Sequence, residues 1–411
     1  MVGIYYPLAS SLFSNGLFAG LGYTMNFVSV PCIKASPDPL NVFATNLEKA
    51  AKIGILTSIV GADNQVNTRI ILTKYAPKGV NDTSYFKVDR SQTVPKPETL
   101  KEGQVLVKAV ALSIDPHLRI YITEPEDKKG LTDDNYQSPL GEPILTIGAG
   151  IVIASNSPNL KVGDKVRGKV FSWQEYAVLQ DSDLTKLPST DRIPLEKYIG
   201  VLGMPAFTAY LGVVTLGESK AGETLLVSAA SGAVGQVVVQ LAKKRGLRVV
   251  GIAGSDDKVE YVRSIGADAA INYKTCGNYV DAIKAAAPEG IDVYFDAVGG
   301  ELLDAALFNL NQRGRVLLCG SMTTFSADRS KVQGIKNIDR MIMKQGVIKG
   351  LFYQPYEGTQ VQTEFFEEMS QLVDNDEIEF KVDERNGLES APQALADTYM
   401  GRNFGKVVVK L

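Results

Sequence analysis

Strands and helices alternate through much of the chain, and this alternation restricts the fold more than any other feature. From about residue 198, apolar runs rich in β-branched residues are separated by segments whose apolar residues recur at helical spacing. The expected strands cover 224–230, 248–253, 269–272, 292–297 and 314–319, and the expected helices cover 233–245, 255–265, 279–287 and 301–310. Strands that are spaced by helices of about 10–15 residues form a parallel, doubly wound sheet. The expected fold class is therefore α/β.

The chain before residue 198 has a different pattern. Short β-type runs bounded by Gly and Pro lie at 68–75, 104–112, 144–153, 162–170 and 174–179. They predict a barrel-like, all-β region, and the run GKVVVKL at 405–411 is expected to return to it. We therefore expect a β domain made of 65–197 and 356–411, a doubly wound domain over 198–355, and an N-terminal extension over 1–64.

The extension has an unusual composition. Its first charged residue is Lys34. A signal peptide starts with basic residues and a transit peptide carries arginines, and neither feature is present. The polar and glycine residues of the stretch also interrupt any span of about 20 apolar residues. The pattern favours a poorly ordered tail or a misassigned start region, and a membrane or targeting role is the alternative.

Composition narrows the functional classes. A formal net charge of −3 and a pI near 5.6 give no general attraction to nucleic acid. The chain has three scattered cysteines, Cys32, Cys276 and Cys319, and a single histidine, His117. Such a set can hardly supply the three or four closely spaced ligands of a zinc site, so we expect no metal. The cysteines also favour a reducing compartment, and we expect a cytoplasmic location.

A glycine-rich loop follows the first expected strand of the doubly wound domain. It reads A-x-G-x-x-G and comprises Ala230, Ser231, Gly232, Ala233, Val234 and Gly235. Gly232 would let the main chain approach a pyrophosphate, and Gly235 would let the helix pack on the strand. The start of the helix supplies unpaired N–H groups and a partial positive charge. Because strand, loop, helix and second strand occur in this order, we favour a dinucleotide-binding domain over a simple tight turn.

The end of the second strand bears on which dinucleotide binds. An NAD-binding site usually has an acidic residue there, whereas this chain has Ala253, Gly254 and Ser255. An uncharged pocket followed by Lys258 suits the 2′-phosphate of NADPH. In the alternative interpretation, Ser255 is an N-cap, two aspartates complement the helix dipole, and Lys258 is an ordinary solvated lysine.

Several separate runs resemble one known family. They are similar to the prostaglandin reductase/alkenal double-bond reductase family, whose members are zinc-independent medium-chain dehydrogenases/reductases. The likeness extends from about residue 67 to residue 411. It rests on the runs AASGAVGQ (229–236), AGSDDKVEYVRSIGADAAINYKT (253–275), YFDAVGGELLD (294–304), GRVLLCGS (314–321), GMPAFTAY (203–210) and NFGKVVVK (403–410).

The resemblance implies a fold and an activity. The fold would be a Rossmann-type doubly wound parallel sheet inserted in a GroES-like β-barrel catalytic domain, and the protein would commonly be a homodimer. The activity would be hydride transfer from NADPH to the β-carbon of a small lipophilic enone or enal. Carried over by position, the residues that contact the cofactor would be Ser231, Gly232, Ala233, Val234, Gly235, Ser255, Lys258, Tyr273, Cys319, Gly320, Ser321, Phe325, Leu351, Phe352, Tyr353 and Asn403.

Three positions depart from the family pattern. His117 stands where the family motif D-P-Y-x-R has tyrosine, Phe325 replaces a tyrosine, and Ala297 replaces an asparagine. An enolate oxygen formed during the reaction needs a hydrogen-bond donor. His117 could be that donor or could protonate the α-carbon, or it could only fill a polar corner of its loop. Tyr353 and the cofactor ribose hydroxyl are the alternative candidates for this donor.

Other side chains could have either a functional or a structural role. A group of large side chains could line a substrate pocket, although such residues more often belong to the core; they are Met204, Phe207, Tyr210, Trp173 and Tyr176. Asp115 and Arg119 are expected to form a structural pair. Two alternative functions stay open, namely a quinone reductase of the same fold and a cofactor-binding protein with little catalysis. A zinc alcohol dehydrogenase is excluded because its ligands are missing.

Overall fold

The computed structural model describes residues 64–77, 82–128, 137–189, 192–325, 327, 332 and 334–411. All of them belong to one compact unit, Ala62–Leu411. Apart from Asn64, the expected N-terminal extension lies outside the described residues. Within the described part, no helix is long and apolar enough to cross a membrane.

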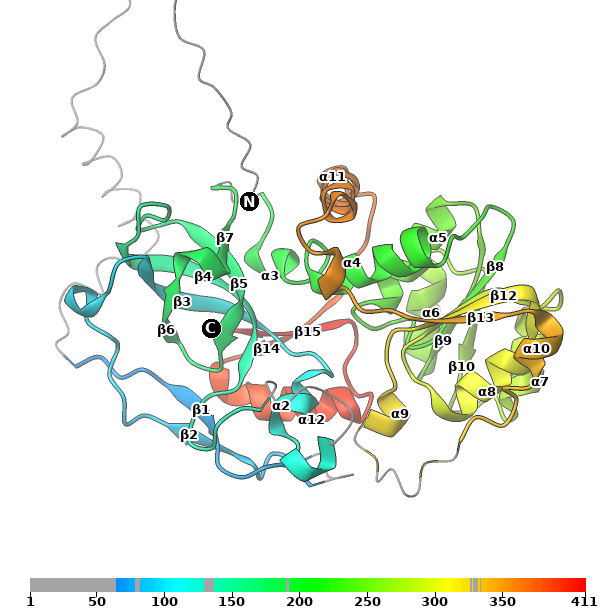
Figure 1. Ribbon diagram of the computed structural model, residues 1–411, viewed down its shortest axis with the longest axis horizontal. Coiled ribbons are helices and arrows are strands. Elements are labelled where there is room, and N and C mark those ends of the chain that lie inside the picture. Colours follow the sequence, from blue (N-terminus) through cyan, green and yellow to red (C-terminus); the bar gives the residue numbers. More distant parts are fainter. Residues whose placement is uncertain are drawn as a thin grey trace, which may run out of the picture. The chain divides into compact units, whose positions relative to one another are not determined.

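A six-stranded parallel sheet forms the α/β part of the chain (Figure 1). Its strands are β8 (Thr224–Val227), β9 (Arg248–Ala253), β10 (Ala269–Asn272), β11 (Ile291–Asp296), β12 (Leu310–Leu318) and β13 (Val347–Gly350). The spatial order is β10-β9-β8-β11-β12-β13. The first strand, β8, therefore lies in the middle of the sheet. β9 and β10 follow on one side of it, and β11, β12 and β13 follow on the other. The prediction of a doubly wound sheet is confirmed, and its switch point lies between β8 and β11.

Helices cover both faces of this sheet because successive strand residues point to opposite sides. Leu225 and Val227 pack in one buried cluster with α5 and α6, and Leu226 packs in another with α7 and α8. The helices of the α/β part are α5 (Gly235–Lys244), α6 (Asp256–Ser264), α7 (Tyr279–Ala286), α8 (Gly300–Phe308), α9 (Met322–Phe325) and α10 (Arg340–Lys344). The expected helices are therefore present with small differences at their ends.

A seven-stranded sheet forms the β part. Its strands are β3 (Gln104–Ser113), β4 (Leu145–Asn156), β5 (Lys165–Ser172), β6 (Tyr176–Gln180), β7 (Leu184–Lys186), β14 (Val382–Asn386) and β15 (Lys406–Lys410). β15 pairs antiparallel with β3, so the return of the C-terminal strand is confirmed. A separate hairpin joins β1 (Arg69–Leu72) to β2 (Phe86–Asp89). The domain boundaries at 197/198 and 355/356 stay a prediction.

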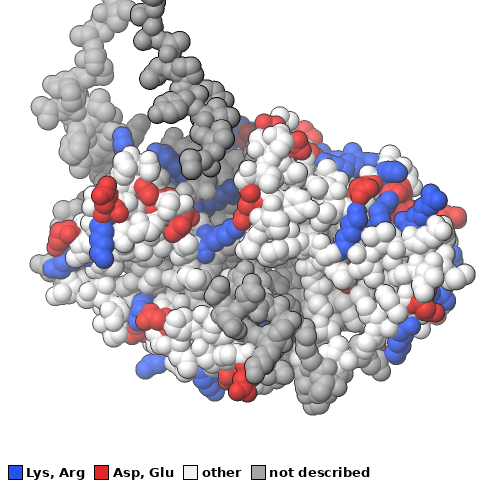
Figure 2. All heavy atoms as spheres, viewed as in Figure 1, with Lys and Arg blue, Asp and Glu red and all other residues white. Residues whose placement is uncertain are grey.

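The remaining helices of the described residues lie between and after these strands. They are α2 (Leu118–Ile122), α3 (Leu195–Tyr198), α4 (Met204–Tyr210), α11 (Gln360–Asp374) and α12 (Ala391–Tyr399), with the 3-10 turns η1 (Pro97–Thr99), η2 (Pro125–Lys128), η4 (Asp181–Asp183), η7 (Gln354–Tyr356) and η8 (Leu388–Ser390). A π-helix, η5 (Leu211–Leu216), continues α4. On the face drawn in Figure 2, basic and acidic side chains of the described residues are interspersed.

Four of the large side chains considered for a substrate pocket are buried, namely Phe207, Tyr210, Trp173 and Tyr176, whereas Met204 is partly exposed. Phe207 and Tyr210 pack against Phe365 of α11, with ring centroids 5.0 and 5.7 Å apart. Trp173 is fully buried against Phe86 in a different cluster. The core interpretation is therefore confirmed for these three aromatic residues, because burial of their apolar surface stabilises the fold.

Candidate functional site

The carboxyl edge of the six-stranded sheet gathers most of the predicted site residues. Parallel strands end at the same edge, and the register aligns Ala253 with Asn272, Asp296 with Leu318, and Leu318 with Gly350. The glycine loop follows the central strand β8. Lys258 and Tyr273 follow β9 and β10 on one side, and the segments 319–321 and 351–353 follow β12 and β13 on the other. Open α/β sheets bind their ligands at this edge, across the switch point.

The glycine loop is shaped by close backbone contacts. A Cβ atom on Gly235 would lie 2.3 Å from the carbonyl oxygen of Ala229 and 2.7 Å from the Cα of Ala230. Only glycine therefore lets α5 begin so close to the end of β8, and the packing role predicted for Gly235 is confirmed. Ser231 is buried, whereas Gly232, Ala233 and Val234 are partly exposed.

Lys258 is buried at the end of β9, so the interpretation as a solvated lysine is wrong. Its ammonium group donates to the carbonyl of Gly401 at 2.8 Å, and the side chain is 9% exposed. Burial lowers the pKa of Lys258, the charge of Lys274 acts in the same direction, and Asp257 and Asp383 oppose them. The charges of Lys258 and Lys274, called the lysine pair below, therefore repel each other, and an anion bound beside them would stabilise both.

Tyr273 and Ser255 lie beside this lysine pair. A Cβ atom on Gly254 would lie 2.7 Å from the Tyr273 ring, so Gly254 lets the ring cover the end of β9. Ser255 occupies the N-cap position of α6 but makes no capping hydrogen bond with its side chain. Its hydroxyl instead donates to the carboxylate of Asp257. The N-cap interpretation therefore holds for the position of Ser255 and not for its side chain.

The other side of the edge is formed by the segments after β12 and β13. The amides of Cys319 and Gly320 donate to the carbonyl of Asp296 at 2.8 and 3.1 Å. Ser321 is hydrogen-bonded to Thr324. Burial raises the pKa of the Cys319 thiol to about 12, in keeping with its expected role as a small apolar residue. Phe325 ends α9, and its side chain lies outside the described residues.

Leu351, Phe352 and Tyr353 follow β13 with different exposure. Leu351 is buried and its amide donates to the carbonyl of Leu318. Phe352 is 56% exposed. The ring of Tyr353 lies under the ammonium group of Lys169 from β5, with 4.9 Å between the nitrogen and the ring centroid. Tyr353 therefore lies where the α/β part contacts the β part.

Asp296 is a buried carboxylate at the switch point that the sequence motifs did not single out. It ends β11 at the switch point with no exposed surface. Its Oδ1 accepts hydrogen bonds from Tyr294 and from the amides of Val298 and Gly299 at 2.8–2.9 Å. Among the described residues, its Oδ2 has no partner. Burial raises the pKa of Asp296 although these hydrogen bonds oppose the shift. The run YFDAVGGELLD contributes to the family resemblance, and the available signal for Asp296 is the aspartate that directly precedes Ala297.

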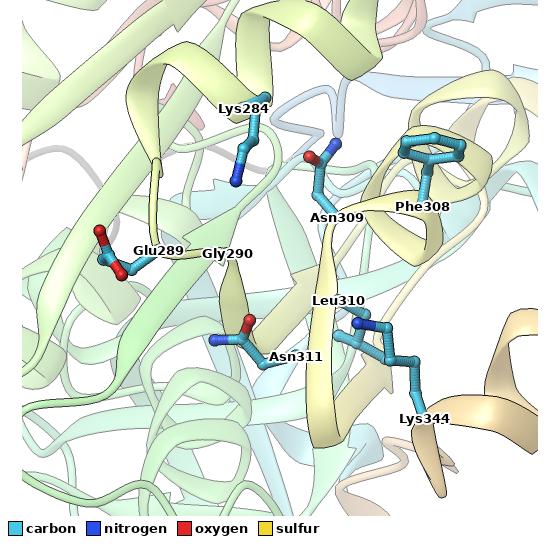
Figure 3. A pocket seen from close by; sticks show the side chains of 8 residues that line it. All are labelled: Lys284, Glu289, Gly290, Phe308, Asn309, Leu310, Asn311 and Lys344. Carbon is cyan, nitrogen blue, oxygen red and sulfur yellow. The ribbon is translucent and has the colours of Figure 1, made fainter.

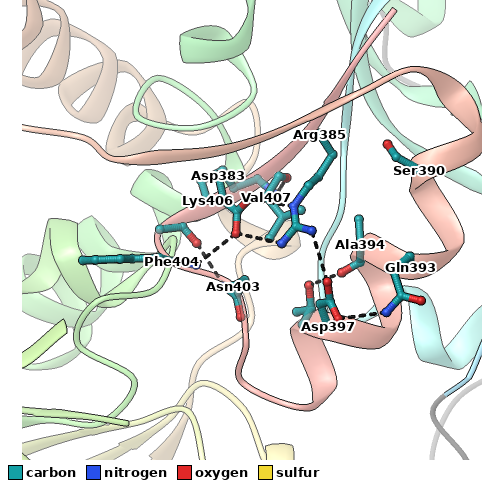
Figure 4. A network of polar contacts seen from close by, with 12 residues as sticks. Asp383, Arg385, Ser390, Gln393, Ala394, Asp397, Asn403, Phe404, Lys406 and Val407 are labelled. Atoms are coloured by element: carbon teal, nitrogen blue, oxygen red, sulfur yellow. Dashed lines mark hydrogen bonds and ion pairs between the residues drawn. The ribbon is translucent and has the colours of Figure 1, made fainter. Parts of the chain in front are cut away.

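The loop before β15 connects this edge to the β part. Gly405 forms a β-bridge with Gly232 of the glycine loop. The side chain of Asn403 donates to the carbonyl of Gly405 at 3.1 Å. An ionic network involving Asp383, Arg385 and Asp397 holds the ends of this loop (Figure 4). This bridge brings Asn403 next to the glycine loop, although about 170 residues separate them in sequence.

His117 immediately precedes α2 in the β part. Burial lowers the pKa of His117, the charge of Asp115 opposes this shift, and the charge of Lys406 adds to it. Its imidazole is therefore neutral near pH 7. A neutral imidazole keeps one N–H group that can donate a hydrogen bond.

The prediction that Asp115 pairs with Arg119 is wrong, because each of the two residues has a different partner. Asp115 forms its ion pair with Lys406 at 2.9 Å. Arg119 instead donates to the carbonyl of Pro77 and stacks over the ring of Tyr399.

The residues at the carboxyl edge fit a dinucleotide. The helix α5 begins without a side-chain cap at Val234. The amides of Gln236 and Val237 donate to the carbonyls of Gly232 and Val234, which leaves the amide of Gly235 at the helix start for a phosphate. Glycine keeps this loop free of side chains at both Gly232 and Gly235. Lys258 adds a positive charge at the end of β9, where the strand brings no carboxylate of its own.

A separate pocket lies at the opposite, amino edge of the sheet (Figure 3). It has a volume of about 190 Å³ and is lined by residues at the start of β11 and β12 and by Lys284 and Lys344. None of the predicted site residues lines it. In the described part of the chain, no three His, Cys, Asp or Glu side chains form a group that could hold a metal ion.

Comparisons with known proteins agree with this architecture. Residues 69–187 match the family described as N-terminal domain of oxidoreductase, and residues 233–375 match the family described as zinc-binding dehydrogenase. The chain is 36% identical over 353 residues to the NADP⁺-dependent 2-alkenal reductase of Nicotiana tabacum, covering 85% of this chain and 98% of the relative.

Two further similarities extend over most of the chain. Prostaglandin reductase 1 of Mus musculus is 34% identical over 313 residues, covering 76% of this chain and 90% of the relative. The crystal structure of CurA from Vibrio vulnificus in complex with NADPH is 31% identical with a TM-score of 0.76, covering 84% of this chain and 98% of that chain. The chain therefore belongs to the prostaglandin reductase/alkenal double-bond reductase family of zinc-independent medium-chain dehydrogenases/reductases and is an oxidoreductase.

Proposed function

We propose that this oxidoreductase uses NADPH to reduce the carbon–carbon double bond of α,β-unsaturated ketones and aldehydes. The observation that carries the proposal is the row of predicted cofactor residues along one edge of the sheet, with the glycine loop at its centre. The names of the tobacco and mouse relatives support the same class of reaction. The substrate would be a small lipophilic enone or enal.

The chain's own residues would hold the cofactor at three places. The glycine loop and the start of α5 would bind the pyrophosphate. Lys258, Ser255 and Tyr273 would bind the 2′-phosphate, for which the lysine pair supplies positive charge. The segments 319–321 and 351–353, with Phe325 and Asn403, would border the nicotinamide side.

The reaction needs a hydrogen-bond donor at the carbonyl oxygen of the substrate. When bound, NADPH supplies a hydride to the β-carbon. Negative charge then develops on the carbonyl oxygen, and a fixed donor to this oxygen is worth about 3–4 kcal/mol. We assign this role to the ring N–H of His117, with Tyr353 as the second candidate. A neutral imidazole suits the task because it donates without bringing a charge into a partly buried site.

The test is a substrate panel with the purified chain. NADPH oxidation is followed with enals, enones and quinones, and each reaction is repeated with NADH. We expect turnover of enones and enals with a strong preference for NADPH. Turnover of quinones alone would contradict the proposal and favour a quinone reductase. Binding of NADPH without turnover of any substrate would favour a cofactor-binding protein with little catalysis.

We also propose that the protein is a homodimer. Among the strands of the described residues, β13 is the last in its sheet, and such an edge offers backbone groups to another chain. Ile342 and Met343, on the helix before β13, are 77% and 79% exposed. Exposed apolar side chains next to a free sheet edge support an interface with a second copy. The cytoplasmic location remains a prediction from the sequence.

A further inference from the structure

A lysine without exposed surface lies at the start of β15. Lys406 is 0% exposed, and an ammonium group has three hydrogens to donate. They go to the carbonyl of Ile114 at 2.8 Å, to Oδ1 of Asp115 at 2.9 Å and to the carbonyl of Val407 at 3.0 Å. Burying such an ion pair is costly unless every hydrogen bond is made. Here the ammonium group of the lysine is fully satisfied.

Lys406 lies between the two halves of the candidate site. Its side chain holds the segment that ends at Asp115, two residues before His117. Its amide donates to the carbonyl of Lys381 at 3.0 Å, and its neighbour Gly405 forms the bridge with Gly232. Figure 4 shows Lys406 next to Asn403 and Phe404 in this segment. A single peptide bond thus separates the contact with the glycine loop from the contact with the loop of His117.

We propose that Lys406 is a positioning residue for the reaction: through Asp115 it fixes the loop of His117 relative to the glycine loop that binds the cofactor. This inference rests on the proposed function, because it needs His117 to act on the substrate. Donor and cofactor must be aligned within a fraction of an ångström, and a misplacement of about 1 Å can lower the rate about a hundredfold.

The charges around His117 make the proposal testable at the imidazole itself. Within the described part of the chain, the charged groups that act on it are Asp115 from its own loop and Lys406 from β15. Tyr121 of α2 adds a ring contact with centroids 6.0 Å apart. Removal of the positive charge of Lys406 should raise the pKa of His117, and removal of the negative charge of Asp115 should lower it. Such opposite shifts would show that both charges act on the imidazole in solution. A fall in kcat at a nearly unchanged dissociation constant of NADPH then separates a positioning role from a purely structural one.

The experiment uses the single histidine of the chain as its reporter. Untagged protein with isotope-labelled histidine is titrated by NMR, so that the one imidazole signal belongs to His117. The variants are Lys406→Met, Asp115→Asn and the double variant. The double variant guards against unfolding, since replacing both members of a buried ion pair is often tolerated when replacing one is not. Lys410→Met is the matched control on the same strand.

We expect opposite shifts in the two single variants, each of about one pH unit. In the double variant, kcat for an enone should fall at least about tenfold while the dissociation constant of NADPH changes much less. Lys410→Met should change neither quantity. The proposal is overturned if the titration of His117 and kcat are the same in Lys406→Met, or in the double variant, as in the unmodified chain.

The two proposals fail in different ways. If the unmodified chain reduces no enone, the proposed function is wrong, and the NMR titration still decides whether Lys406 sets the environment of His117. If the unmodified chain reduces enones and the double variant does so equally well, the proposed function stands and the role of Lys406 is wrong.

Discussion

Individual residues of this site are defined as much by burial as by their chemical type. Lys258 was one of several lysines in the sequence, but in the fold it has 9% exposure and an acceptor in Gly401. A charged group held in a partly buried place binds a partner more strongly than one in water, because the surrounding dielectric screens it less.

Lys258 should discriminate between the two nicotinamide cofactors. Lys258→Met removes a charge-assisted hydrogen bond to a phosphate, which is worth about 1.5–3 kcal/mol. We expect the KM for NADPH to rise about 10- to 100-fold, by the usual conversion of free energy to equilibrium constant. The KM for NADH should stay nearly unchanged, since NADH lacks the 2′-phosphate.

Steady-state kinetics with both cofactors tests this prediction. The matched control is Lys244→Met, which removes a lysine of α5 that pairs with Glu377 on the surface. An equal rise in KM for NADPH and NADH would show that Lys258 acts only by holding Gly401.

At the scale of elements, the junction of β8 and α5 depends on one glycine. Gly235→Ala would place a methyl group 2.3 Å from the backbone oxygen of Ala229. These are backbone atoms, so the clash can be relieved only by shifting the helix, and overpacking of this kind costs about 1–3 kcal/mol. We expect a lower melting temperature in thermal unfolding followed by circular dichroism.

Gly350→Ala is the control for this prediction. It lies at the end of β13, where a Cβ atom would meet nothing within 4 Å. Its melting temperature should match that of the unmodified chain. If Gly235→Ala also left the melting temperature unchanged, α5 would not be held tightly against β8.

The strands that were missed are short or depend on contacts distant in sequence, whereas the missed helix α11 spans 15 residues. β14 has the sequence VDERN, which lacks the apolar alternation of a half-buried strand. It forms because β15 lies beside it and supplies backbone partners from Lys406 to Lys410. β2 likewise consists of only four residues, which pair with β1.

At the scale of the whole molecule, the apolar surface beside β13 should form the dimer interface. Replacing both Ile342 and Met343 with lysine puts two charges into this surface, and desolvating them on association would be costly. We expect the variant to be monomeric in light scattering after gel filtration, whereas the unmodified chain is dimeric.

Val162→Lys is the control for the dimer prediction. Val162 is 52% exposed in the turn between β4 and β5, which belong to a different sheet from β13. This variant should remain dimeric. A dimer that persists in the Ile342 and Met343 variant would place the interface elsewhere on the molecule.

The sequence by itself determined the architecture and the cofactor loop. Helical and strand periodicities are local, so β9 and β10 were predicted with the bounds that they have. The glycine loop was equally readable, because the requirement for Gly235 arises within a few residues. Only the tertiary structure decided which charges meet: Asp115 pairs with Lys406 across 291 residues, and Asp296 lies unexposed at the switch point. Electrostatic partners and burial depend on which chain segments fold together, and no local pattern encodes that.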